Sequence, residues 1–142
     1  MISFVCGQLC SGKTLYSRAL AHTSSAHCIE VGDVVRMIKI SQDRKVLQNS
    51  KELSGAIVDW IKKSCNEHTE LVVSGVRQKE ILENFPNSTL LWIECPINTR
   101  KERYQKRDRV GDTQTFEEAE QGDINLGIFE VRNYIFSKNY TP

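Results

Sequence analysis

The first residues that could carry chemistry form a glycine-rich segment close to the start of the chain. Residues 7–14 read Gly-Gln-Leu-Cys-Ser-Gly-Lys-Thr, which fits the spacing Gly-x4-Gly-Lys-Ser/Thr. Glycines let the main chain curl around an anion, and the N-terminus of a following helix adds partial positive charge. The segment follows an apolar run, residues 2–6, as a phosphate-binding loop (P-loop) between a strand and a helix requires. The sequence therefore predicts a nucleotide-phosphate site at the first turn of the chain.

The side chains of this loop have separate expected roles. We expect Lys13 to reach the β- and γ-phosphates of ATP and the hydroxyl of Thr14 to ligate Mg²⁺. The full set expected to bind ATP is Gly7, Cys10, Ser11, Gly12, Lys13, Thr14, Leu15 and Arg103. The alternative is a glycine-rich turn with an exposed lysine and no ligand.

Length, charge and cysteine usage limit the kinds of protein this can be. The 142 residues suit one domain, residues 1–142, and the formal net charge of +1 excludes a bulk polycation, so any contact with nucleic acid requires a local basic patch. The five cysteines form no Cys-x-x-Cys pair, which is typical of reduced thiols in a cytosolic protein. No signal-peptide pattern and no apolar run of membrane-spanning length is present. We therefore expect a cytoplasmic protein, in the host cytoplasm if viral, with no membrane partner.

Apolar runs alternate with stretches of helical periodicity along the chain. Strands are expected at about 2–6, 27–31, 71–73, 89–95 and 133–137. Helices are expected at about 13–21, after 33, from 49 to 68, and at 79–85, 98–109, 116–121 and 125–131. Asp33 and Asn49 occupy N-cap positions, and Gly122 separates the last two helices. The alternation predicts an α/β fold with a five-stranded parallel sheet covered by helices on both faces.

Four segments follow expected strands and should meet at one place. Ligands of parallel sheets bind at the carboxyl ends of the strands. This rule brings residues 7–14, 32–36, 74–77 and 96–109 around one mouth. The mouth is the predicted binding site.

Three arginines of the segment 96–109 share one face of its expected helix. Arg100, Arg103 and Arg107 lie at i, i+3 and i+7. Phosphoryl transfer needs cations around the charge spread over the γ-phosphoryl oxygens, so arginines that close over the phosphates are an expected device. The alternative is a solvated helix with an ion pair between Glu102 and Lys106.

The strand-end segments resemble those of adenylate kinase-like nucleoside monophosphate kinases. Gly32-Asp33-Val34-Val35-Arg36 resembles their Gly-Asp-x-x-Arg segment, and Ser74-Gly75-Val76-Arg77 is similar to their Asp-Gly-x-(Pro)-Arg segment. Arg103, Arg107 and Arg109 resemble the Arg-x-x-x-Arg-x-Arg pattern of the lid, here about 97–112, with Asp112 beyond it. Residues 123–139 are similar to dephospho-CoA kinase-like proteins and phage deoxynucleotide kinases. The resemblance implies the three-layer αβα P-loop kinase fold.

The resemblance also implies roles for these side chains. Arg36 and Arg77 would hold the acceptor, together with Asp33. The catalytic set would be Lys13, Asp33, Arg103 and Arg107. Asp33 could cap its helix, or it could orient or deprotonate the acceptor hydroxyl, and the residues leave both open. The family usually has an acidic residue where this chain has Ser74, so metal binding would depend on Thr14, with Asp33 compensating.

The expected function is ATP- and Mg²⁺-dependent transfer of the γ-phosphate to a nucleotide-type acceptor. The acceptor-side segments are short, and this profile resembles compact phage kinases that phosphorylate 5-hydroxymethyluracil in DNA during DNA modification. The alternatives are a kinase of a free deoxynucleoside monophosphate or dephospho-CoA-like molecule, and, from another class, an NTP-dependent switch or a non-catalytic nucleotide-binding module. DNA is thus a candidate partner, and the oligomeric state is open.

Overall fold

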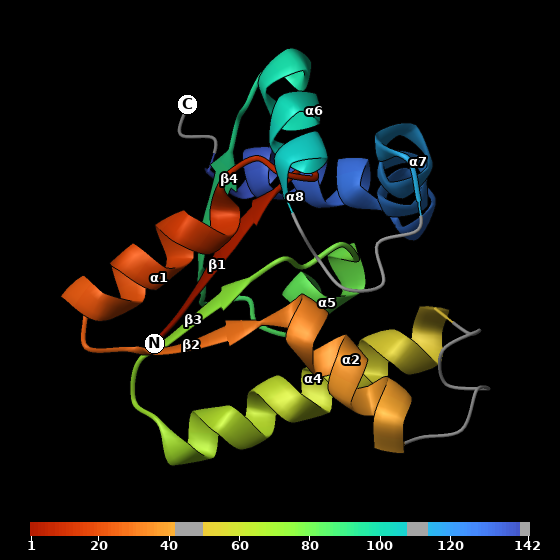
Figure 1. Cartoon of the computed structure of the whole chain (residues 1–142). Helices are drawn as coiled ribbons and strands as arrows, with labels where there is room; N and C mark the ends of the chain where they lie inside the picture. The colour runs from red at the N-terminus through yellow and green to blue at the C-terminus, as the bar shows by residue number, and fades with distance from the viewer. Residues whose placement is uncertain (42–49, 108–113, 140–142) are drawn as a thin grey trace.

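A computed structural model describes residues 1–41, 50–107 and 114–139 (Figure 1). The strands are β1 (Ile2–Gly7), β2 (His27–Glu30), β3 (Leu71–Ser74) and β4 (Thr89–Ile93). The helices are α1 (Lys13–Thr23), α2 (Val31–Ser41), α4 (Ser50–Glu67), α5 (Lys79–Glu83), α6 (Ile97–Lys106), α7 (Phe116–Leu126) and α8 (Ile128–Asn139).

The strands form one parallel sheet in the order β2-β3-β1-β4. Val5 of β1 lies opposite Ser74 of β3 on one side and Leu91 of β4 on the other. All carboxyl ends of these strands therefore point to the same edge. The α/β class and the layered P-loop kinase fold expected from the sequence are confirmed.

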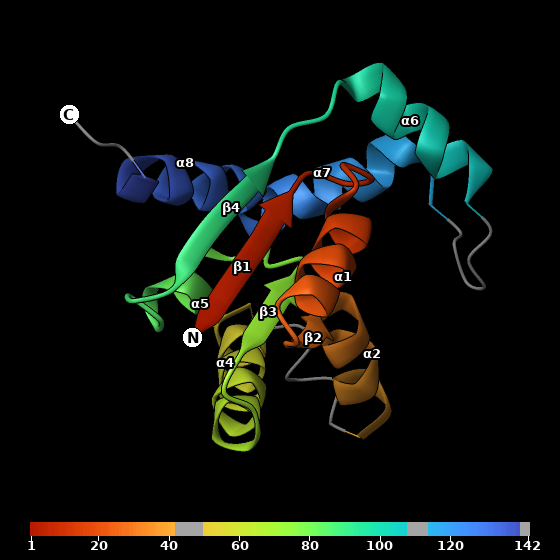
Figure 2. The same cartoon turned by 90° about the vertical axis from the view of Figure 1, so that its left-hand side faces the viewer.

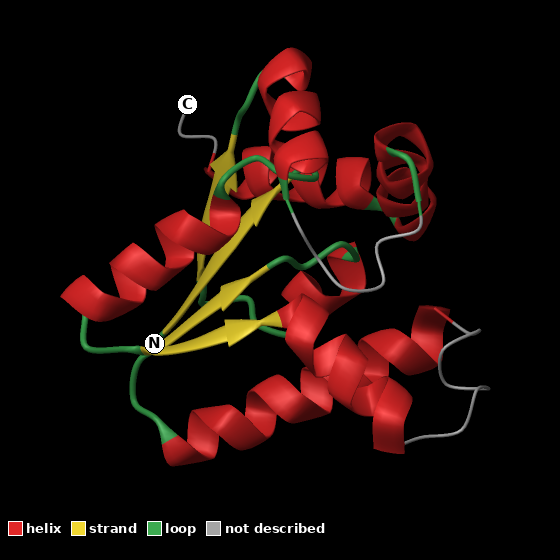
Figure 3. Cartoon of the chain, in the orientation of Figure 1, coloured by secondary structure: helices red, strands yellow, loops and turns green. Residues whose placement is uncertain are grey.

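Alternate side chains of the strands enter two separate cores, one on each face of the sheet. Phe4 and Cys6 pack into the larger core, while Val5 packs into the smaller one with Ala21 of α1. The larger core also contains buried side chains of α4, α5 and α8: Ile57, Ile61, Ile81, Leu82, Val131 and Ile135. Figures 2 and 3 show the resulting layers, with α1 on one face of the strands and α4, α5 and α8 on the other.

The expected fifth strand at 133–137 is wrong, because these residues lie in α8. The segment Tyr-Ile-Phe looks like a short buried strand when it is considered alone. Ile128, Val131 and Ile135, however, repeat at helical spacing and are all buried, and α8 packs against β1 and β4. Burial of this helical face decides the structure. The sheet has four strands in the ranges that the structure describes.

The helix boundary expected at Gly122 is also wrong. Residues 116–126 form the single helix α7, which begins with a capping box between Thr115 and Glu118 and ends at Gly127. A glycine inside a helix costs only about 1 kcal/mol relative to alanine, which the cap and the buried residues of α7 outweigh. Gly127 has a φ of 116°, the left-handed conformation that ends helices.

Asp33 does not lie at the N-cap position that the sequence predicts. Helix α2 begins at Val31, so Asp33 lies inside its first turn and not at the N-cap. Val31 directly follows β2, and the side chains of Val31 and Val34 are buried in the larger core. Their burial explains why the helix begins before Asp33. The expected cap at Asn49 and the lid residues Arg109 and Asp112 lie outside the described residues. In the described part of the chain, no helix has the length and apolar character needed to span a membrane.

Candidate functional site

The P-loop connects β1 to α1 through backbone conformations that few residues adopt. Gly12 has a φ of 96° and Cys10 a φ of 59°, both in the left-handed region. A Cβ at Gly12 would lie 3.4 Å from an Arg103 side-chain nitrogen, and one at Gly7 would lie 3.0 Å from the carbonyl oxygen of Ile93 and closer still to Ser11. Gly12 is therefore needed for the left-handed turn, and Gly7 is needed for the close packing.

Three successive carbonyl oxygens of the loop accept hydrogen bonds from cationic side chains. Lys13 Nζ donates to the carbonyl of Gln8 at 3.2 Å. Arg100 donates to Leu9 and Arg103 to Cys10, both at 3.2 Å. The carbonyl dipoles of the loop are thus held by cations, two of which come from α6, some 90 residues later in the chain.

Lys13 lies in an environment that disfavours its charge. The pKa of its ammonium group is lowered to about 8, chiefly by burial and also by the positive charge of Arg77, while Asp123 acts in the opposite direction. A desolvated cation next to another cation gains strongly from a bound polyanion. The electrostatics of the loop favour phosphate.

The loop opens into a cavity of about 620 Å³ at the carboxyl edge of the sheet. Residues of the P-loop segment and of the end of α6 line it, namely Leu9, Cys10, Ser11, Gly12, Lys13, Thr14, Leu15, Arg103 and Arg107. The lining also includes Arg18 of α1 and residues at the ends of β2 and β3: Glu30, Gly32, Val35, Arg36, Ser74, Gly75 and Arg77. The mouth expected from the strand-end rule exists, and it brings Arg36 and Arg77 together with the P-loop.

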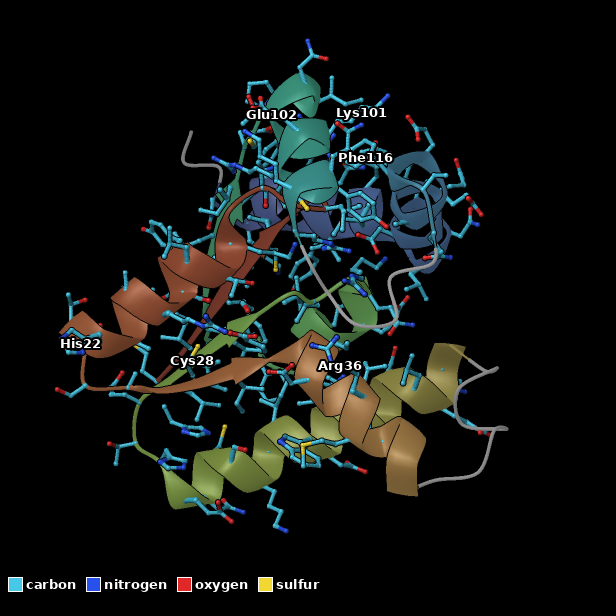
Figure 4. The ribbon with its side chains drawn as sticks, viewed as in Figure 1. His22, Cys28, Arg36, Lys101, Glu102 and Phe116 are labelled. Carbon is cyan, nitrogen blue, oxygen red and sulfur yellow. The ribbon has the colours of Figure 1, made fainter. Side chains whose placement is uncertain are left out.

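Asp33 is not among the residues that line the cavity, but it forms an ion pair at 2.5 Å with Arg36, which does line it. Both side chains are more than half exposed, at 57% and 61%. Figure 4 shows Arg36 beside the start of α2, near the carboxyl end of β2. An exposed pair of this kind is held weakly and can exchange partners with a ligand.

The donor groups around the loop fit a magnesium ion bound with a nucleotide. Thr14 and Ser74 both line the cavity and carry hydroxyls. Among the described residues no group of three or more His, Cys, Asp or Glu side chains could form a metal cage. Magnesium commonly keeps several waters and binds through one or two protein ligands plus substrate phosphates. The described lining offers these two hydroxyls and the carboxylate of Glu30, which is paired with Arg18.

The arginines of α6 separate into two roles that their shared spacing does not distinguish. Arg100 is only 3% exposed and binds the Leu9 and Cys95 carbonyls and the carboxylate of Glu120. Arg103 and Arg107 reach Cys10 and line the cavity. Arg100 is therefore a buried anchor between α6, the P-loop and α7.

The surface ion pair considered as an alternative for this helix is also present. Lys106 and Glu102 lie 2.7 Å apart on α6. Figure 4 shows Glu102 and Lys101 beside the middle of α6, with Phe116 between α6 and α7. One face of α6 is thus solvated while another faces the P-loop.

Asp123 of α7 is a site residue that sequence reasoning missed. Its carboxylate lies 3.1 Å from Nε of Arg77, and the residue is 7% exposed. Burial raises its pKa, against the opposing effects of Arg77 and Lys13. A signal was present, because Phe116, Glu120 and Asp123 share one helical face, which carries two acids beside a buried aromatic residue.

Comparison with known proteins identifies a family and relatives of the chain. A family model described as "AAA domain" matches residues 4–124. A UPF0200 protein of Staphylothermus marinus is 26% identical over 155 residues, covering 98% of this chain and 80% of the relative. A UPF0200/UPF0201 protein of Archaeoglobus fulgidus is 30% identical over 144 residues, and the match covers 87% of this chain but only 43% of the relative.

Solved structures with the same fold include two shikimate kinases. The enzyme of Aquifex aeolicus has a TM-score of 0.57 and 19% identity, with 97% of this chain and 83% of that chain covered. The Acinetobacter baumannii enzyme, solved in complex with shikimate, has a TM-score of 0.62 and 14% identity, with 96% and 78% covered. At these identities the likeness establishes the P-loop kinase fold alone.

Proposed function

This chain belongs to the AAA domain family, and we propose that it is an ATP- and Mg²⁺-dependent phosphotransferase that acts on a nucleotide-type acceptor. The observation that carries the proposal is the shared cavity. Lys13 of the P-loop and two arginines from other strand ends, Arg36 and Arg77, line the same space of about 620 Å³. A protein that only bound or hydrolysed a nucleotide would not need Arg36 and Arg77 in that space in addition to the cations of the P-loop and α6.

The side chains around the P-loop would stabilise the transferred phosphoryl group. Lys13 would bind the β- and γ-phosphates from the base of the cavity, and Arg103 and Arg107 would approach from α6 as negative charge develops. Thr14, with the hydroxyl of Ser74 in the same lining, would hold Mg²⁺, which would supply positive charge to the phosphates.

The acceptor side would bind an anionic group and a hydroxyl. Arg36 and Arg77 would hold a phosphate or carboxylate of the acceptor. Asp33, now paired with Arg36, would exchange that partner for the acceptor hydroxyl and orient it or accept its proton.

Two acceptor types agree with this arrangement. The first is a free small molecule such as a deoxynucleoside monophosphate, a dephospho-CoA-like compound or shikimate, the ligand in one of the solved relatives of the fold. The second is the hydroxymethyl group of 5-hydroxymethyluracil in DNA, whose backbone phosphates could reach Arg36, because that side chain is 61% exposed.

The decisive experiment is mass spectrometry of a panel of acceptors after incubation with MgATP. The panel includes deoxynucleoside monophosphates, dephospho-CoA, shikimate and hydroxymethylated DNA. We expect a mass increase of one phosphoryl group on one acceptor class, and none with Lys13→Ala. If the protein binds ATP but phosphorylates no member of the panel, a switch or a non-catalytic nucleotide-binding module explains the P-loop better.

The variant Arg36→Ala distinguishes a kinase from an NTP-dependent switch. We expect Arg36→Ala to raise the KM for the acceptor by about tenfold or more, since an arginine–anion contact contributes about 1.5–3 kcal/mol. Slow hydrolysis of ATP without acceptor should change little. Arg132→Ala is the matched control, because Arg132 is not among the residues that line the cavity and its ion pair with Glu94 is exposed, so the KM should not change. Near-normal phosphotransfer in Arg36→Ala would contradict the role of Arg36.

A further inference from the structure

Helix α7 places a carboxylate directly behind the cations of the candidate site. Asp123 is 7% exposed, although aspartate is rarely so buried without a reason. One of its oxygens lies 3.1 Å from Nε of Arg77. The other, Oδ2, is buried and accepts no hydrogen bond within the described part of the chain.

The surroundings of Asp123 are mostly cationic and belong to the site. Arg77, Lys13 and Arg107 each act on its charge, and all three line the cavity. Glu120, one turn earlier on α7, is occupied by Arg100. The carboxylate is thus held in the protein interior chiefly by cations of the phosphate site, and not by a hydrogen-bond network of its own.

The position of α7 is fixed at both ends and in the middle. The capping box at Thr115 begins the helix, and the buried ion pair between Glu120 and Arg100 ties it to α6. At its end Gly127 lies beside the backbone of Arg77, since a Cβ there would be 3.5 Å, an ordinary contact distance, from the Arg77 carbonyl oxygen. A helix held in this way keeps the Asp123 carboxylate at a constant place relative to Arg77.

Arg77 is held by this ion pair. Its Nε is buried and lies 3.1 Å from the Asp123 carboxylate, with no hydrogen-bond partner in the part of the chain that the structure describes, while the side chain is 36% exposed and lines the cavity. A guanidinium group that uses one edge for a fixed carboxylate can present its remaining N–H groups to a second anion. Without Asp123 as its partner, the long side chain of Arg77 would lose rotamer entropy each time that it bound an anion.

We propose that Asp123 is a positioning residue, which holds the Arg77 guanidinium so that it receives an anionic group of the acceptor. The inference rests on the proposed function, because Arg77 belongs to the acceptor side of that site. Asp123 itself touches no reacting atom in this role. It acts through Arg77 alone.

The test is the binding of inorganic phosphate to protein saturated with a non-hydrolysable ATP analogue and Mg²⁺, measured by calorimetry. The analogue fills the P-loop, so phosphate reports the acceptor side. We expect Asp123→Asn to weaken phosphate binding by about tenfold, the loss typical of a residue that supports a ligand-binding group. Glu117→Gln is the matched control on the same helix, since Glu117 forms an exposed ion pair with Lys101, and it should bind as the wild type does.

A double-mutant cycle with Arg77→Gln distinguishes positioning from a general structural effect. In the Arg77→Gln background, Asp123→Asn should change phosphate affinity by less than about twofold, because the residue through which it acts is gone. Equal losses in both backgrounds would overturn the inference. So would wild-type affinity in Asp123→Asn, or phosphate binding by the wild type that does not depend on Arg77.

Two further measurements keep the result interpretable. If circular dichroism shows that Asp123→Asn is unfolded, Asp123→Glu replaces it, which keeps the charge but displaces it by one methylene. Wild-type affinity in that variant would contradict a role that depends on the place of the carboxylate. The acceptor panel is a separate assay, so absence of phosphotransfer together with Arg77-dependent phosphate binding would reject the proposed function without rejecting the role of Asp123.

Discussion

At the scale of single residues, the candidate site depends on a balance between buried cations and the groups that hold them. Lys13 and Arg103 donate to carbonyls of the P-loop, and Arg77 faces the carboxylate of Asp123. Cations that are partly removed from water need such partners, since burial of an unpaired charge is costly. The same partners leave the cations directed toward the cavity, where a polyanion would add the missing negative charge.

Cys6 provides a test of burial at this scale. Burial raises the pKa of its thiol to about 12, against a small opposing effect of Lys13. Because the thiolate is the reactive form, Cys6 should stay unmodified by iodoacetamide up to about pH 10 in the native protein. Cys65 is exposed on α4 and should be labelled under the same conditions. Peptide mass spectrometry measures both, and denaturant should make Cys6 reactive. Rapid native labelling of Cys6 would contradict its burial beneath the P-loop.

At the scale of elements, α6 and α7 are joined to the P-loop by buried polar contacts. Arg100 of α6 contacts the loop carbonyl of Leu9 and the carboxylate of Glu120 on α7. Asp123 on the same face of α7 reaches Arg77. Two helices from the second half of the chain therefore complete a site whose motif lies at the first turn.

Removal of Arg100 should be strongly destabilising. Arg100→Ala leaves Glu120 without its partner in a mostly buried place and leaves two carbonyls, of Leu9 and Cys95, without that donor. We expect a loss of about 3–5 kcal/mol in the free energy of unfolding, the usual result of breaking a buried ion pair. Lys101→Ala is the neighbouring control, because it removes only a surface ion pair with Glu117 and should change little. Urea denaturation measures both, and equal effects would contradict the anchoring role of Arg100.

The two glycines of α7 should respond to alanine in opposite directions. A Cβ at Gly122 meets nothing within 4 Å, so Gly122→Ala should stabilise the protein by about 0.5–1 kcal/mol through helix propensity. Gly127 has a φ of 116°, and Gly127→Ala should destabilise by about 1–2 kcal/mol. Thermal denaturation of the pair checks the single-helix assignment of residues 116–126. A destabilising Gly122→Ala would favour the helix break expected from the sequence.

At the scale of the whole molecule, the site joins parts of the chain that are distant in sequence. The P-loop, α2, the end of β3 and α6 all contribute to one cavity. A ligand that fills such a cavity links these parts to each other and so favours the folded state over the unfolded one.

MgATP should therefore raise the thermal stability of the protein. At a concentration one hundred times its Kd, a ligand that binds only the folded state adds about 2.7 kcal/mol, which for a domain of this size corresponds to a rise in Tm of roughly 10 °C. Differential scanning fluorimetry measures the shift. Lys13→Ala should lose most of it, while Lys106→Ala, which removes an exposed ion pair on α6, should keep it. An unchanged shift in Lys13→Ala would contradict phosphate binding at the P-loop.

Much of the fold follows from local patterns of residues. Residues 7–14 identify the P-loop because its chemistry depends on glycine, lysine and threonine at fixed spacing, and the apolar runs at 2–6 and 71–73 identify central strands because both faces of a parallel sheet are buried. The strand-end rule then brings Arg36 and Arg77 to the P-loop. Each of these inferences needs only neighbours in sequence or the topology of the sheet.

Local patterns fail where a choice depends on contacts between distant segments. Residues 133–137 became a helix because the face of Ile128, Val131 and Ile135 packs on the sheet. Arg100 and Arg103 lie on the same helical face, but the rotation of α6 against the P-loop buries Arg100 and leaves Arg103 in the lining of the cavity. Arg100 is therefore an anchor, which its spacing alone does not predict. Asp123 joined the site only through the packing of α7 behind Arg77. The P-loop is thus readable from eight consecutive residues. The placement of the charges around it is decided by tertiary packing, because burial and charge pairing are properties of segments that meet only in the folded chain.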